Sequence, residues 1–134
     1  MKHFIAQGNW SAVAAALYGL WGLLHLGLGA AMIVAGVSGG PPAGEAAAES
    51  LMFFVCAAVF GVQAITVALT MNRLNSRRGY WLNLVTLGVV DVAFLALMVR
   101  PGHVDPVGGA SGPLIWLLAA VASTVALRRE PVSA

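Results

Sequence analysis

The sequence predicts an all-α integral membrane protein, a four-helix bundle with short loops, on two observations: its composition and the length of its apolar runs. Of its 134 residues, 60% are hydrophobic and 9% are charged, whereas a soluble domain has about 45–50% apolar and about 25% charged residues. Four apolar runs reach the length of about 20 residues that a helix needs to cross a bilayer. We expect these spans at about 9–37, 46–71, 79–100 and 107–127, within a single membrane domain, 1–134, that leaves no room for a soluble catalytic domain.

The basic residues predict the orientation of the bundle. All but one lie at the amino end, in the second loop or at the carboxyl end, which share one side of a four-span protein; only Arg100 lies on the other side. By the positive-inside rule, we expect both termini in the cytoplasm of a bacterium and the spans in its inner (plasma) membrane. The same positions explain the pI near 9.2, so nucleic acid is not expected as a partner. The residues on the cytoplasmic side are Lys2, Arg73, Arg77, Arg78, Arg128 and Arg129.

The first run, 9–37, is too long for the apolar region of a signal peptide, which has about 7–15 residues, so we interpret it as a retained span. Small residues recur in it at every seventh position and form one smooth stripe on a helix. Such a stripe allows two membrane helices to approach closely, although small residues are also common in alanine-rich spans, and both interpretations stay open. The stripe is Ala15, Gly22, Gly29 and Gly36.

The second run, 46–71, follows a loop rich in glycine and proline, and it carries a polar face. Gln63 lies near its middle, and because lipid offers no partner for an amide, we expect Gln63 to face other helices. The single cysteine, Cys56, lies in the same run, so no disulfide within the chain is possible, and we expect it to be inert.

The third run, 79–100, carries Asp91 near its middle. A carboxylate at this depth costs at least about 2.5–3.5 kcal/mol, so we expect a specific partner or a function for it. At helical spacing Tyr80 shares the face of Asp91, and Asn83 lies on its flank. The fourth run is nearly free of polar side chains and ends at Arg128.

Three polar residues lie at similar depth on three different spans: His25, Gln63 and Asp91. In a compact bundle His25 and Asp91 can come into contact, and such a pair titrates as a unit and suits proton transfer. We therefore predict His25 and Asp91 as catalytic residues. The aromatic residues deeper in the spans (Trp21, Phe53, Phe54, Phe60 and Phe94) would line a lipophilic pocket or pack the core. The predicted substrate-binding residues are Tyr18, Trp21, Gln63, Tyr80 and Asn83.

Each of these residues also has a purely structural interpretation. A membrane histidine often bonds a backbone carbonyl, and a buried acid or amide often joins two helices, at about 0.6 kcal/mol on average. The loop residues Glu45, His103 and Asp105 have no zinc-binding spacing, so no metal site is expected, and no cofactor motif is present.

The function hypothesis that follows is an isomerase, cyclase or hydrolase that acts on a lipid-like or isoprenoid-like substrate from the bilayer. Two alternatives stay open: a small subunit or assembly factor of a larger membrane complex, and a homodimeric proton-coupled transporter or channel. The expected partners are membrane lipids and a hydrophobic small molecule, together with either a second copy of the chain or another membrane subunit.

Overall fold

The computed structural model describes residues 9–133, and the prediction of an all-α four-helix bundle is confirmed. All four helices are long and apolar enough to cross a membrane, as expected for a small polytopic membrane protein. A 3₁₀ turn, η1, links the second and third helices, and a π-helical turn, η2, extends the third. The elements are α1 (Trp10–Val37), α2 (Glu45–Thr70), η1 (Asn72–Leu74), α3 (Arg77–Phe94), η2 (Leu95–Val99) and α4 (Pro106–Arg129).

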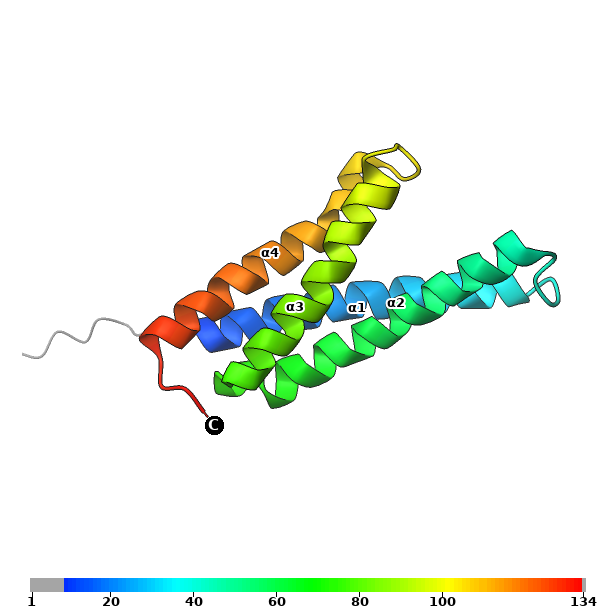
Figure 1. Ribbon diagram of the computed structural model, residues 1–134. Helices are drawn as coiled ribbons and strands as arrows, with labels where there is room; N and C mark the ends of the chain where they lie inside the picture. The colour runs from blue at the N-terminus through cyan, green and yellow to red at the C-terminus, as the bar shows by residue number, and fades with distance from the viewer. Residues whose placement is uncertain (1–8, 134) are drawn as a thin grey trace, which may run out of the picture.

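The helices form two antiparallel hairpins, α1–α2 and α3–α4 (Figure 1). The hairpins lie close together at the end of the bundle that holds the C-terminus, where α1 packs against both α2 and α4. Toward the opposite end they diverge, so that their connecting loops lie far apart (Figure 1). The bundle is therefore forked, with a closed end and an open end.

The glycine stripe of the first helix lies in the seam between α1 and α2. A Cβ added at Gly22 would stand 2.7 Å from the backbone oxygen of Gly61, and one at Gly29 would stand 2.7 Å from the backbone oxygen of Phe54. Backbones this close exclude any side chain, which is the reason for glycine at these positions. Of the two interpretations of the stripe, close helix packing holds, and the partner helix is α2 of the same chain.

Hydrogen bonds between distant parts of the chain fasten the closed end. The Glu130 carboxylate accepts from the backbone N–H groups of Trp10 and Ser11, which caps the start of α1. Asn75, in the left-handed conformation at φ 51°, donates its amide to three backbone oxygens at the end of α4. These oxygens belong to Ala126, Glu130 and Pro131, at 3.2, 3.3 and 3.0 Å.

Candidate functional site

A pocket of about 350 Å³ lies between α1, α2 and α3, in the half of the bundle where the hairpins diverge. Its volume falls in the range of about 300–1,000 Å³ that is usual for small-molecule sites. The lining is almost entirely apolar, and its polar groups come from α1 and α3. The lining residues are Trp21, His25, Phe53, Cys56, Ala57, Phe60, Val90, Asp91, Ala93, Phe94, Leu97 and Met98.

Asp91 is held by Trp21. The indole Nε1–H of Trp21 donates a hydrogen bond of 2.9 Å to Asp91 Oδ2, and both side chains are almost completely buried. A buried hydrogen bond contributes about 0.5–1.5 kcal/mol, which offsets part of the cost of placing an acid at this depth. Trp21 therefore explains how α3 tolerates an acid in its middle.

His25 lies one helical turn after Trp21 and stacks on the indole, with ring centroids 3.6 Å apart and planes 16° from parallel. Its Nδ1 lies 2.8 Å from the backbone oxygen of Trp21. Because a carbonyl oxygen can only accept, Nδ1 carries the proton of the neutral ring, and Nε2 is left with a free lone pair. The stack and the hydrogen bond together fix the ring orientation and its tautomer.

His25 and Asp91 converge on Gly112 of α4. A Cβ added there would stand 3.3 Å from His25 Nε2, 2.9 Å from His25 Cε1 and 3.8 Å from Asp91 Oδ1. The two residues share no direct hydrogen bond among the described residues, and Trp21 lies between them as stacking partner of one and donor to the other. The predicted pair is thus assembled as a triad with Trp21, in which Nε2 and Oδ1 both lie beside Gly112.

The π-helical turn η2 begins four residues after Asp91. In it Arg100 N bonds Leu95 O at 2.8 Å, one residue further back than in an α-helix. Such turns change which side chains face a neighbouring helix, and they are frequent at functional sites. Here Leu97 and Met98 of this turn line the pocket together with Phe94.

The other four predicted substrate-binding residues lie outside this pocket. Tyr18 is fully buried in the core against Leu87. Asn83 donates to Asn72 Oδ1 at 2.9 Å and joins η1 to α3. Tyr80 pairs with the Thr124 hydroxyl at 3.2 Å, and Gln63 is partly buried on α2. Their roles in substrate binding stay predictions, since their contacts are those of packing groups.

Three of the residues that lie outside the pocket each have a buried polar atom without a partner within residues 9–133. The Tyr18 hydroxyl, Gln63 Nε2 and Asn83 Oδ1 have no hydrogen-bond partner among the described residues. Each sits on a different helix, from α1 to α3. Asn83 donates to Asn72, and His25 and Asp91 are held by Trp21.

Several residues in or beside the pocket were not among the predicted site residues. Gly112 of α4, which lies outside the pocket lining, carries no functional group, and its missing side chain lets the His25 ring pack against its backbone. Cys56, expected to be inert, lies in the wall with an exposed side chain. The aromatic signal did point to Phe53, Phe60 and Phe94, which the sequence alone could not separate from core residues.

No group of three His, Cys, Asp or Glu side chains within residues 9–133 could hold a metal ion. Asp105, one of the loop acids, instead caps α4 by accepting from Gly108 N at 2.7 Å.

No protein-family model, curated protein or solved structure matches this chain. Function is therefore inferred from the chemistry of the pocket.

Proposed function

We propose that this protein binds a lipophilic small molecule in the pocket between α1, α2 and α3 and transfers protons on it through His25 and Asp91. The observation that carries the proposal is that His25 Nε2 and Asp91 Oδ1 come together beside Gly112 while both residues line the pocket. Both atoms are free of other hydrogen bonds among the described residues, and an apolar pocket of about 350 Å³ adjoins them. A ligand with one polar or unsaturated group and a hydrocarbon body fits this combination.

Isomerisation is the reaction that the pocket supports best among isomerase, cyclase and hydrolase chemistry. His25 Nε2 takes a proton from one carbon of the ligand, and protonated Asp91 delivers a proton to another. One C–H bond breaks, one forms and a double bond moves. His25 then releases its proton to solvent and Asp91 takes one up, which restores both groups, so neither water nor a redox partner is consumed. An almost wholly apolar lining suits a reaction that needs no second substrate, whereas hydrolysis requires a water molecule.

Trp21 is the positioning residue in this proposal. Its indole N–H holds one oxygen of Asp91, which leaves the other oxygen for proton transfer. Its ring holds the imidazole of His25 by stacking. Fixed orientation of both groups is what general acid–base catalysis requires.

The ligand reaches the pocket from the bilayer, between the diverging halves of α2 and α3. Phe53 and Leu97, on these two helices, line the pocket and are well exposed, as expected for residues that face lipid. The closed end carries most of the arginines, and we propose that it faces the cytoplasm of a bacterial inner membrane.

Incorporation of solvent deuterium tests this function, with the native membrane lipids as the pool of candidate substrates. Protein in discs made from these lipids is incubated in D₂O, and the lipids are extracted, washed in H₂O and examined by mass spectrometry. The expected result is one lipophilic compound with deuterium on carbon. Labelling should be lost in Asp91→Asn and His25→Gln and retained in His103→Gln, which changes a histidine outside the pocket.

The proposal would be contradicted if Asp91→Asn labelled the compound as strongly as the unchanged protein does, or if the unchanged protein labelled no compound.

Of the two alternatives, the subunit interpretation has the weaker support. A glycine stripe on the surface would offer a partner subunit a place to pack, and here that stripe is occupied by α2. A homodimeric transporter would place His25 and Asp91 along a pathway between two copies, and proton flux in liposomes that disappears in Asp91→Asn would favour it.

A further inference from the structure

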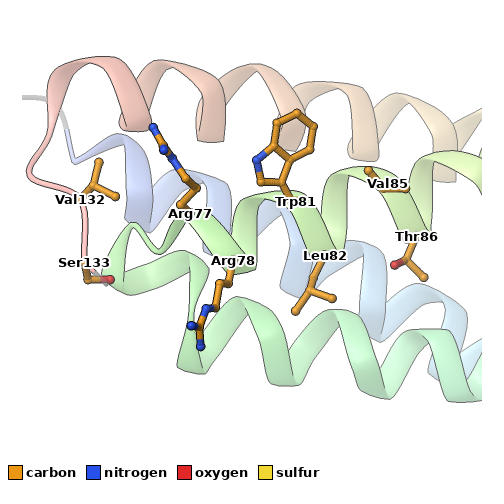
Figure 2. Close-up of a pocket in the computed structure, with 8 residues that line it drawn as sticks. All are labelled: Arg77, Arg78, Trp81, Leu82, Val85, Thr86, Val132 and Ser133. Carbon is orange, nitrogen blue, oxygen red and sulfur yellow. The ribbon is translucent and has the colours of Figure 1, made fainter.

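A second hollow lies on a different face of the molecule, along the outer surface of α3 at the closed end. It is a shallow, open groove of about 1020 Å³. Figure 2 shows Arg77 and Trp81 on one side of α3 and Arg78 and Leu82 on the other. The remaining lining residues are Val85 and Thr86 of α3 and Val132 and Ser133 of the C-terminal segment.

The polar and apolar parts of this groove are separated along the helix. Arg77 and Arg78 begin α3, and Val85 lies two turns further on, about 12 Å away at the usual helical rise. Between them Trp81 is 55% exposed, a position typical of tryptophan at the border of headgroups and hydrocarbon. Leu82 and Val85 are also exposed and continue the groove into the apolar zone.

None of the five acidic side chains, all of which lie within residues 9–133, lines this groove. Of these five residues, Asp91 lies in the pocket and Glu130 caps the start of α1. The other three, Glu45, Glu49 and Asp105, begin α2 and α4 at the opposite end of the bundle. Arg77 and Arg78, one on each side of α3 above an apolar channel, thus complement an anionic headgroup with its acyl chains.

We infer that this groove binds one anionic phospholipid from the leaflet at the closed end. The headgroup phosphate lies between Arg77 and Arg78, and an acyl chain runs past Trp81 along Leu82 and Val85. This site is separate from the pocket beside Asp91 and does not depend on the function proposed for it.

Native mass spectrometry with added lipid tests the inference. Full-length protein in detergent is titrated with phosphatidylglycerol or with phosphatidylcholine of the same chains. We expect one phosphatidylglycerol to be retained preferentially, and Arg77→Gln/Arg78→Gln to weaken its binding about tenfold, since each surface arginine contributes appreciably to the binding of anionic lipid. The matched control is Arg128→Gln/Arg129→Gln, which removes the same charge at the same end.

Val85→Trp fills the groove without a change in charge and should also weaken phosphatidylglycerol binding. All of these positions are exposed, and circular dichroism verifies that each variant is folded. The inference would be overturned if the protein retained the two lipids equally, or if the two double arginine variants lost phosphatidylglycerol binding to the same extent. Displacement of the lipid by inorganic phosphate at constant ionic strength, or unchanged binding in Val85→Trp, would equally overturn it, because the site would then recognise a free anion.

Discussion

The two ends of the bundle are built differently. At the closed end, Glu130 binds the start of α1, Asn75 binds the end of α4, and Asn83 binds Asn72. At the open end the hairpins diverge, and the glycine-rich first loop is exposed (Figure 1). The pocket lies on the open side, and its wall includes half-exposed side chains such as Phe53.

This difference shows how a small membrane protein can combine a defined site with access from lipid. Hydrogen bonds at the closed end fix the register of all four helices, and the fixed register places Trp21, His25 and Asp91 at one depth. At the open end the two hairpins diverge from each other, and we propose that a ligand enters there between α2 and α3. Regions of low local stability are where binding elements commonly occur.

The largest loss of stability should follow a change at the closed end. Asn75→Ala removes three hydrogen bonds to backbone oxygens and places alanine at φ 51°. We expect the free energy of unfolding to fall by about 2–4 kcal/mol, measured by reversible unfolding in mixed micelles.

Asn75→Gly separates the two causes, because glycine adopts this φ without strain. Asn75→Gly should therefore lose less stability than Asn75→Ala does. Unchanged stability of both variants would show that the closed end does not depend on Asn75.

A smaller loss of stability is expected for a change at Trp21, midway between the two ends. Trp21→Phe removes the donor to Asp91 Oδ2 and leaves a buried carboxylate unpaired, at a cost of about 1–3 kcal/mol. In an Asp91→Leu background the same change should cost much less, and this double-mutant cycle measures the coupling.

Trp116→Phe is the matched control, since its indole donates to the backbone oxygen of Leu84. It should show no coupling to Asp91. Equal costs of Trp21→Phe with and without Asp91 would mean that the two side chains do not stabilise each other.

The smallest effect on stability is expected at the open end. Phe53→Ala removes a ring that is 46% exposed, so we expect less than about 1 kcal/mol of change. The same change enlarges the mouth of the pocket and should reduce retention of the lipophilic ligand. Val89→Ala, on the lipid-facing side of α3 and outside the pocket, is the control for both measurements.

A loss of stability in Phe53→Ala as large as in Asn75→Ala would remove the distinction between the two ends.

The fold class could be predicted from the sequence because membrane spans obey a length and a composition rule. The seven-residue glycine repeat also indicated close packing, although it could not name α2 as the partner. The energetic cost of an acid in the middle of a span indicated that Asp91 has a specific role. Its hydrogen bond from Trp21 could not be predicted, because it depends on how α1 and α3 cross, which sequence periodicity does not determine.

The pocket itself was harder to predict from the sequence. The sequence allowed a contact between His25 and Asp91 but could not show whether they touch. In the structure both lie beside Gly112, a residue with no side chain to signal its part. Tyr80 and Asn83 were predicted to bind substrate because they lie on or beside the Asp91 face of the same helix. In the structure Asn83 hydrogen-bonds to Asn72 and Tyr80 to Thr124, nearer the closed end than the pocket.

The most direct test of the central claim is ligand retention in Gly112→Ala compared with Gly27→Ala. A methyl group at Gly112 would stand 2.9 Å from His25 Cε1 and must displace the ring, whereas one at Gly27 meets nothing within 4 Å. Native mass spectrometry of protein purified in mild detergent reports the bound small molecule in each case. We predict that the unchanged protein and Gly27→Ala retain one lipophilic compound of defined mass and that Gly112→Ala loses it while remaining folded. Full retention by Gly112→Ala would show that ligand binding does not depend on the position of the His25 ring beside Asp91.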